Sequence, residues 1–219
     1  KMKTYCDTNH LKFEEHYLRE MVLFPDIQRY AFYSDDFKEN LINDGITKPE
    51  KLFMKYFMKD LNLSNTDKML LHDVNAYLPN DLLVKMDRMS MANSLEARSP
   101  FLDHKISEFV SKLPPELKRK GNEGKIILKN AFNDFIPANI LNRTKQGFGV
   151  PLDKWFRSDL EEMLKDNLLS NTFKNRGYFS AEKISNLIYE HINHKIDNSS
   201  KLWSLLLLEL WHQEFFDNI

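Results

Sequence analysis

The stretch 81–103, DLLVKMDRMSMANSLEARSPFLD, predicts a helix with one charged face and one apolar face. At 100° per residue, Leu and Met side chains share one stripe, while Asp81, Lys85 and Arg88 lie on another at i, i+4, i+7 spacing. This spacing places opposite charges in register, which stabilises an exposed helix by only about 0.2–0.5 kcal/mol per pair. Because the apolar stripe favours burial, we expect the helix to be largely covered and its charges to be paired.

The end of the same stretch predicts a helix boundary and a second helix start. Pro100 disfavours the α conformation at Ser99, so the first helix should end by about Ser99. Asp103 can then cap a helix that begins at His104. A basic residue between two carboxylates, such as Arg98, is more often structural than catalytic. We therefore interpret the charged residues of this region as an ion-pair framework around a cleft: Asp81, Lys85, Arg88, Glu96, Arg98 and Asp103.

The composition is that of an ordinary globular protein, since 42% of the 219 residues are apolar and 29% are charged. Lys and Arg number 31 against 32 Asp and Glu, so no bulk charge favours nucleic acid or an anionic membrane as a partner. The single Cys6 forms no internal disulfide, which favours a reducing compartment, with the cytoplasm as the default. Apolar runs such as 205–208 are far shorter than the ~18 residues of a membrane span.

The pattern of caps and breaks predicts an all-α fold, an irregular multi-helix domain. Only 6 of 219 residues are Gly, and runs of alternating β-branched residues are few. Ser64 should open one helix, and Pro79 should separate it from the central one. The closing helix has a broad apolar band that includes Leu207 and Trp211, so it should be a core helix or dock on a partner. The other helices expected, besides a further one ending near 42, are 12–23, 28–33, 51–60, 65–77, 106–113, 125–135, 155–169, 180–194 and 202–216.

We predict one helical domain over 1–219. It would comprise peripheral helices in 1–76, a motif-bearing region in 77–157 and C-terminal helices in 158–219. The chain starts at Lys1 rather than Met and carries no signal-like segment, and we interpret it as a fragment of a larger protein.

The segment 121–125, GNEGK, is a candidate phosphate site. Glycines before a helix let backbone N–H groups approach a phosphate, and Lys125 would add a positive charge in the first turn. It is not a Walker A loop, which has another spacing and a hydroxyl where this chain has Ile126. From these residues alone, a plain glycine-containing turn with a solvated Lys is the favoured interpretation.

The loop 143–151, RTKQGFGVP, is a second candidate. Arg143 and Lys145 are cations in a loop that Gly147 and Gly149 keep open, and such a loop can bind a phosphate or a carboxylate. Glycine loops with exposed cations are common, so the signal is weak when taken alone.

The histidines do not predict a metal site. Of seven His, only His191 and His194 form a close pair, at i and i+3, and a zinc site needs more ligands than these. We therefore predict no metal and expect the pair to be surface-exposed. No nucleophile elbow is present, and Cys6 lacks a motif that would mark it as a nucleophile.

Three blocks in order, YLPNDLLVKMDRMSMANSLEARSPFLDH, GNEGKIILKNAF and RTKQGFGVPLDKWFR, resemble the C-terminal half of the synthetase domain of glutamine-hydrolysing asparagine synthetases. The resemblance covers 77–157. It implies that Lys125, in the family's G-K-x-x-L pattern, is the catalytic cation of the adenylating site. It also implies that four further residues border the cleft for ATP, pyrophosphate or substrate: Gly124, Arg143, Lys145 and Gly147.

The resemblance further implies a reaction for the parent enzyme. ATP, with Mg²⁺, would adenylate aspartate, and ammonia released from glutamine by an N-terminal glutaminase domain would displace AMP. The family's S-G-G-x-D-S loop, its acidic S-G-[DE]-G-x-D-E motif and its N-terminal catalytic Cys are absent here, since Cys6 lacks that context. We therefore expect this chain to lack the nucleotide-binding half, to bind no cofactor by itself and to be inactive alone. A homodimer is left open, as are a ligase for another carboxylate and a non-catalytic helical interaction module.

Overall fold

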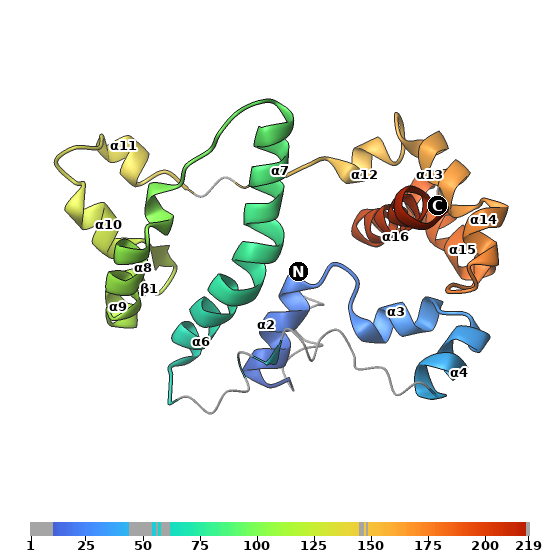
Figure 1. Cartoon of the computed structure of the whole chain (residues 1–219), viewed down its shortest axis with the longest axis horizontal. Helices are drawn as coiled ribbons and strands as arrows, with labels where there is room; N and C mark the ends of the chain where they lie inside the picture. Colours follow the sequence, from blue (N-terminus) through green and yellow to red (C-terminus); the bar gives the residue numbers. More distant parts are fainter. Residues whose placement is uncertain are drawn as a thin grey trace. The chain divides into compact units, whose positions relative to one another are not determined.

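The computed structural model describes residues 11–43, 54–55, 57, 62–144, 147 and 149–217. It divides the chain into two compact units, drawn in Figure 1. The terminal unit combines Lys1–Leu52 with Phe148–Ile219, and the central unit is Phe53–Gly147. The described residues are mainly helical, which confirms the predicted all-α class. The prediction of one domain with three zones stays a prediction.

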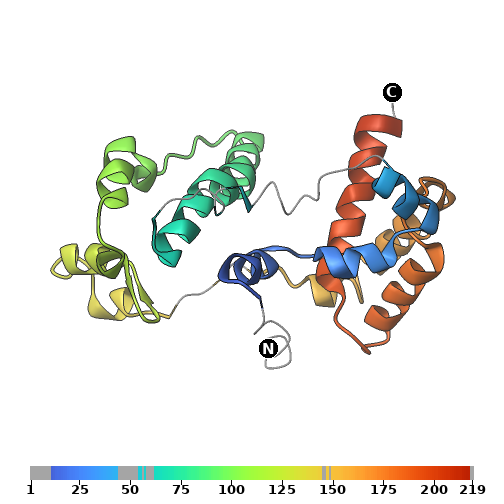
Figure 2. The same ribbon diagram turned by 90° about the horizontal axis from the view of Figure 1, so that it is seen from below.

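The terminal unit is built from the two ends of the chain. Its long C-terminal helix α16 packs against α12, α13 and α15 (Figure 2). A π-helical turn, η3, continues α16. The elements are α2 (Phe13–Met21), α3 (Asp26–Phe32), α4 (Asp35–Asn43), α12 (Leu152–Trp155), α13 (Glu161–Leu168), α14 (Asn171–Asn175), α15 (Ala181–Ile192), α16 (Ser199–His212) and η3 (Gln213–Asp217).

Backbone hydrogen bonds join the N-terminal helices to the C-terminal ones in this unit. Ser34 N–H donates to the Tyr178 carbonyl at 3.0 Å, and Ser180 N–H donates to the Phe32 carbonyl at 2.9 Å. Tyr33 and Phe179 form the isolated antiparallel bridge between these two pairs. The segment between α3 and α4 is therefore fixed to the start of α15.

The terminal unit holds the main hydrophobic core. The closing helix is a core helix, which is one of the two predicted alternatives, and the predicted apolar band is confirmed in part. Leu206 is buried and Trp203 and Leu210 pack against the core, whereas Leu207 and Trp211 are 44% and 47% exposed. The buried stripe of this helix is Leu202, Leu205 and Leu206. The other buried core residues are Phe24, Phe156, Leu164, Leu168, Phe173, Ile184, Leu187 and Ile188.

The central unit carries the sequence motifs. A short antiparallel hairpin pairs Arg119 with Gly124 and Lys120 with Glu123, a small departure from the helix-only prediction. A partly buried ion pair, 3.5 Å between Lys118 Nζ and Asp67 Oδ1, connects the base of this hairpin to α6. The elements are α6 (Asn65–His72), η1 (Asp73–Leu83), α7 (Val84–Ala92), η2 (Pro100–Leu102), α8 (His104–Ser111), α9 (Pro115–Lys118), β1 (Arg119–Lys120), β2 (Glu123–Gly124), α10 (Ile126–Ala131) and α11 (Ala138–Leu141).

One continuous helical run joins α6, η1 and α7, so the prediction that Pro79 separates two helices was wrong (Figure 1). Pro79 lies inside η1, which has π-helical hydrogen bonding. A proline removes a backbone donor and crowds the preceding turn, and a wider turn accommodates both effects. Asn80 Nδ2 donates to the Ala76 carbonyl at 2.8 Å and satisfies one acceptor of this stretch. Ser64 caps the start of the run as predicted, accepting from Asp67 N–H at 3.1 Å.

The end of α7 comes earlier than Pro100 alone predicts. The helix ends at Ala92, and Ser94 adopts a left-handed backbone with φ of 58°. Leu95 N–H then donates to the Ser90 carbonyl at 2.9 Å, which closes the helix end. Asp103 caps α8 as predicted, since its Oδ1 accepts from Lys105 N–H at 2.8 Å.

Three further expectations concern the helix at 51–60, the helix at 155–169 and the absence of a membrane-spanning segment. The helix expected at 51–60 lies outside the described residues except at 54, 55 and 57, and Cys6 lies outside them too. The helix expected at 155–169 begins only at Glu161, while α12 ends at Trp155. In the part of the chain that the structure describes, no helix has both the length and the apolar content needed to cross a membrane.

Candidate functional site

The charged face of α7 is exposed rather than covered. Lys85 Nζ lies 3.5 Å from Asp81 Oδ1, with side chains 62% and 48% exposed. Arg98 contacts Glu96 in an equally open setting. Arg88 makes no ion pair or hydrogen bond with any residue that the structure describes. Among the described elements, η1 is the one that α7 contacts extensively, so nothing here desolvates these charges and the expected burial of this helix is not observed.

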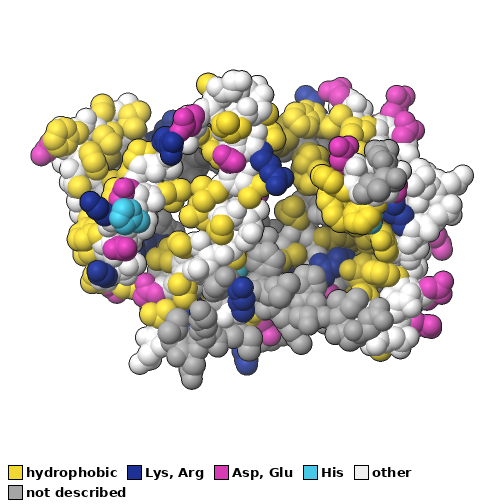
Figure 3. Space-filling view, viewed as in Figure 1, with side chains coloured by type: hydrophobic (Ala, Val, Ile, Leu, Met, Phe, Trp, Pro, Cys, Tyr) yellow, Lys and Arg dark blue, Asp and Glu magenta, His cyan; other side chains and the backbone are white. Residues whose placement is uncertain are grey.

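An open groove of about 730 Å³ lies between the η1–α7 helix and the segment that follows it. The helical part of the stretch 77–104 and the segment that follows that helix therefore contribute to one surface. On this surface, hydrophobic side chains are interspersed with charged ones (Figure 3). The lining residues are Pro79, Leu83, Val84, Met86, Asp87, Ala97, Arg98, Ser99, Pro100, Leu102 and Asp103.

The hairpin β1–β2 positions Lys125 at the start of α10. Gly121 takes φ of 59° in the two-residue turn, a left-handed conformation that glycine adopts at low cost. Lys125 itself has φ of 60° and ψ of 34°, which is uncommon for a residue with a side chain. Its carbonyl accepts from Lys129 N–H at 2.9 Å, the first bond of α10. The backbone of Lys125 is thus held in a conformation that proteins often retain at functional sites.

Among the described residues, no carboxylate compensates the ammonium of Lys125. Glu123 pairs with Lys129, whose Nζ lies 2.8 Å from Oε1, and this hydrogen bond lowers the pKa of the Glu123 carboxyl. Lys125 is exposed and forms no ion pair or hydrogen bond with a described residue. The nearby carboxylate is therefore used by Lys129, and Lys125 is available to an external anion.

The second candidate loop is described in part. Arg143 follows α11, is exposed, and makes no side-chain hydrogen bond or ion pair within the described part of the chain. Gly147 is also exposed, whereas Lys145 lies outside the described residues. Gly124, Lys125, Arg143 and Gly147 all belong to the central unit.

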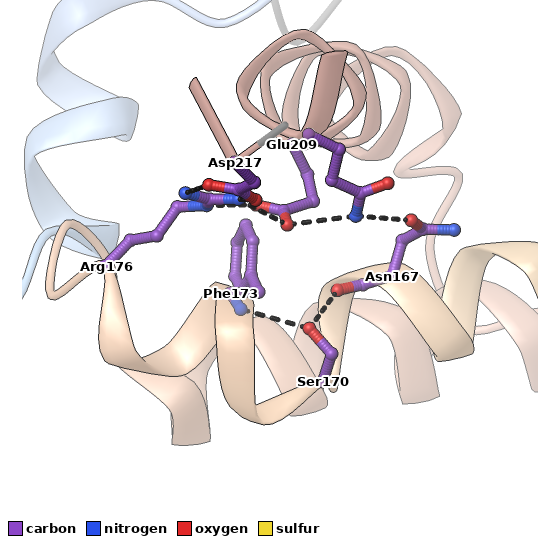
Figure 4. A network of polar contacts seen from close by, with 7 residues as sticks. Asn167, Ser170, Phe173, Arg176, Glu209 and Asp217 are labelled. Atoms are coloured by element: carbon purple, nitrogen blue, oxygen red, sulfur yellow. Dashed lines mark hydrogen bonds and ion pairs between the residues drawn. The ribbon is translucent and has the colours of Figure 1, made fainter. Parts of the chain in front are cut away.

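Sequence reasoning missed a buried ion pair in the terminal unit (Figure 4). Arg176 donates to Glu209 through Nε, 2.6 Å from Oε2, and through Nη2, 3.0 Å from Oε1. Glu209 is fully buried, and Arg176 also contacts Asp217, 2.5 Å from Nη2 to Oδ2. Gln213 Nε2 donates to Glu209 and to Asn167, both at 3.0 Å. Because both carboxylates hydrogen-bond the guanidinium, the pKa of Arg176 is raised, and the cluster is structural.

The prediction that His191 and His194 are both surface-exposed was wrong for His191, which is fully buried. His191 Nδ1 accepts from Asn198 N–H at 3.2 Å, and its carbonyl accepts from Arg157 Nε at 2.7 Å. Arg157 also pairs with Asp153. Ligand-type atoms of Asp153, His191 and Asp197 lie within 4.8 Å of one another, but the Arg157 cation already pairs with Asp153. We therefore interpret the cluster as an ion-pair and hydrogen-bond network.

A sequence model of the family described as asparagine synthase matches residues 9–213. The chain belongs to the asparagine synthase family. This confirms the resemblance drawn from the three sequence blocks, and it extends the match to the helices on both sides of them.

Relatives of this asparagine synthase family member include three glutamine-hydrolysing asparagine synthetases. The glutamine-hydrolysing asparagine synthetase 1 of Bacillus subtilis (strain 168) is 36% identical over 157 residues, 72% of this chain and 24% of its own length. Asparagine synthetase 3 of the same strain is 32% identical over 62% of this chain and 20% of its own length. The human enzyme is 33% identical over 41% of this chain and 18% of its own length. The chain thus spans about a quarter or less of these relatives, and no solved structure matches it.

Proposed function

We propose that this chain is the C-terminal part of the synthetase domain of an ATP-dependent, glutamine-hydrolysing asparagine synthetase. The observation that carries the proposal is Lys125, an exposed cation that no described residue pairs, held in a left-handed conformation at the start of α10. The family match supports the reaction class. The missing parts would be an N-terminal glutaminase domain and the nucleotide-binding half of the synthetase domain, and the single Cys6 is consistent with a cytoplasmic enzyme.

The residues of the central unit fit the phosphates of ATP. Lys125 and Arg143 are exposed cations that no described carboxylate neutralises, and phosphate oxygens are the ligands that Lys and Arg prefer. The loop carboxylate, Glu123, is paired with Lys129. In this proposal Lys125 and Arg143 add cationic contacts to the phosphates, while the nucleotide and Mg²⁺ would be held mainly by the nucleotide-binding half.

The proposed role of Lys125 follows from the chemistry of amide formation. A carboxylate oxygen of aspartate is a poor leaving group, and its conversion to an acyl adenylate lets ammonia displace AMP. Negative charge grows on phosphate oxygens when pyrophosphate departs. A positioned ammonium stabilises that charge more in the transition state than in the ground state, which is the condition for accelerating the step.

The test is Lys125→Ala in the full-length enzyme, assayed with ammonia as the nitrogen donor so that the glutaminase step is bypassed. We expect kcat to fall by roughly 10²–10³-fold with a smaller change in the KM for ATP. The matched control is the double variant Lys129→Ala, Glu123→Gln, because it removes an ion pair one turn further along α10 without freeing the Glu123 carboxylate beside Lys125. An unchanged kcat for Lys125→Ala would return this segment to a plain glycine turn.

Two alternatives differ from this proposal in class or substrate. The open groove of about 730 Å³ beside α7 favours a helical interaction module as the second candidate. A module without catalysis would bind a protein and tolerate Lys125→Ala, so the same variant separates the two functions. A ligase acting on another carboxylate would lose activity with Lys125→Ala but form a different amide, which product analysis by mass spectrometry identifies.

A further inference from the structure

His191 is a buried side chain that the proposed reaction does not use. It lies at the end of α15, with no exposed surface, and the ring of Phe156 meets it edge-on at 6.3 Å. It continues the buried face of α15, which carries Ile184, Leu187 and Ile188 at helical spacing. A titratable ring therefore stands where an apolar side chain would be usual.

Hydrogen bonds fix the protonation state of this ring. Nδ1 accepts from Asn198 N–H at 3.2 Å, so it carries no proton, and the proton of the neutral ring lies on Nε2. Nε2 finds no hydrogen-bond partner within the described residues. Asn198 is itself buried and donates from Nδ2 to the Leu187 carbonyl at 3.3 Å. The ring thus connects α15 to the residue that precedes α16.

Three charged groups face the ring from the elements around it. Arg157, which follows α12, donates to the His191 carbonyl at 2.7 Å and pairs with Asp153 of α12. Asp197, in the connection between α15 and α16, lies 3.7 Å from Nδ1 and accepts from Ser199 N–H at 3.0 Å. A protonated His191 would place a second cation beside Arg157, with the Asp197 carboxylate already engaged.

We propose that His191 is an acid-sensitive latch between α15 and α16: protonation of Nδ1 removes the acceptor for Asn198 N–H and loosens the connection 193–198. The neutral ring closes the latch, and the charged ring opens it. Opening frees the start of α16, the helix that supplies Leu202, Leu205 and Leu206 to the core.

The direction of the pH effect follows from linkage. Burial, and secondly the Arg157 cation, lower the pKa of His191, while Asp153 and Asp197 partly oppose this. The unfolded chain has the ordinary histidine value of about 6.5 and binds a proton more readily than the folded chain below that pH. Stability is therefore full above about pH 6.5 and falls as the pH drops, until the folded pKa is passed. Burial raises the pKa of the Asp197 carboxyl, but hydrogen bonds from Ser199 and nearby cations more than offset this and lower it below its ordinary value, so Asp197 acts only well below the pH range of His191.

The tryptophans make this measurable in the 219-residue chain. All three, Trp155, Trp203 and Trp211, belong to the terminal unit, so their fluorescence reports the unfolding of this unit alone. Urea unfolding of the chain is followed between pH 7.5 and 5, for wild type, His191→Gln and His194→Gln. His194 is the matched control, because it lies three residues further along the chain, just beyond α15, and is exposed.

We expect the folding equilibrium constant of wild type and of His194→Gln to fall by up to ~tenfold per pH unit below about 6.5. His191→Gln should show a flatter profile over the same range. If the folding equilibrium constant falls equally steeply with decreasing pH in wild type and in His191→Gln, the proposed latch is wrong.

A second measurement on wild type covers the case in which His191→Gln fails to fold. Nitrogen NMR of the imidazoles follows the protonation of His191, and amide hydrogen exchange follows Asn198. We expect the protection of the Asn198 amide to be lost in the same pH step in which the ring gains its proton. Protection that persists after the ring is charged, or a ring that stays neutral until the unit unfolds, contradicts the proposal.

Discussion

Arg176 and Glu209, 33 residues apart in the chain, form a two-point ion pair in which the carboxylate has no exposed surface. The pair joins the residue that follows α14 to the last turn of α16 in the terminal unit (Figure 4). A buried charge of this kind is costly once its partner is removed, because the remaining ion stays out of water without compensation.

The first prediction concerns this pair. Arg176→Leu should leave Glu209 buried and unpaired and lower the free energy of unfolding of the terminal unit by about 3–5 kcal/mol. The double variant Arg176→Leu, Glu209→Leu removes both charges and should recover most of that loss. Urea unfolding followed by tryptophan fluorescence measures both. A loss below about 1 kcal/mol in the single variant would mean that Glu209 is solvated.

The second prediction concerns the charged face of α7. Because Arg88 is exposed and unpaired among the described residues, Arg88→Leu should change the free energy of unfolding of the central unit by no more than about 0.5 kcal/mol. Far-ultraviolet circular dichroism reports the helices of both units and tryptophan fluorescence reports the terminal unit alone, so the difference between the two signals follows the central unit, which contains no Trp. Ser64→Ala is the positive control, since loss of the cap on Asp67 N–H should cost about 1 kcal/mol. A loss of several kcal/mol for Arg88→Leu would show that this face is covered after all.

The third prediction concerns the proline inside η1. Pro79→Ala restores a backbone donor and removes the ring, so it should stabilise the α6–η1–α7 helix, by about 1–3 kcal/mol. Pro115→Ala is the matched control, because Pro115 is the first residue of α9, where no helical donor is needed. Thermal unfolding by circular dichroism compares them. If Pro79→Ala destabilised the chain, the π-helical turns would be required for packing, and the missing donor and the proline ring would not be what limits the stability of this helix.

The fourth prediction concerns the chain by itself. Exposed cations such as Lys125 and Arg143 should attract pyrophosphate only weakly, and the attraction should fall between low salt and about 0.15 M. Calorimetric titration with ATP-Mg and with pyrophosphate measures this, and Lys125→Ala with Arg143→Ala should abolish what is seen at low salt. Micromolar ATP binding that survives the higher salt would place the nucleotide site within these 219 residues and refute the assignment to a missing half.

Local signals were sufficient where the structure depends on neighbours in sequence. The predicted caps at Ser64 and Asp103 are confirmed, because each satisfies a backbone donor two or three residues away. The three sequence blocks also indicate the family through residue identity and spacing alone, and the family match over residues 9–213 confirms it.

Long-range packing decided the rest. Pro79 reads as a break, yet the helix widens into π turns and continues through it. Two of the buried polar residues, His191 and Glu209, had a signal in the sequence that could have been used. His191 follows Ile184, Leu187 and Ile188 on one helical stripe. Glu209 follows Leu202, Leu205 and Leu206 at the same spacing. Helical period alone does not show which distant residue will pair with a buried polar side chain. His191 was therefore predicted to be exposed, and Glu209 was not singled out.

The sequence by itself determined the helical class, several helix ends and the family, because these depend on spacing within short segments. Only the tertiary structure decided which charges are buried. Lys85 and Arg88 are exposed on α7, where few described elements cover them. Glu209 is buried because Arg176, which is distant in the sequence, pairs with it. His191 is buried because Asn198, on the far side of the connection between α15 and α16, donates a hydrogen bond to its ring. Burial of a charged or polar group depends on a partner that desolvates with it, and such partners are brought together by packing rather than by sequence order.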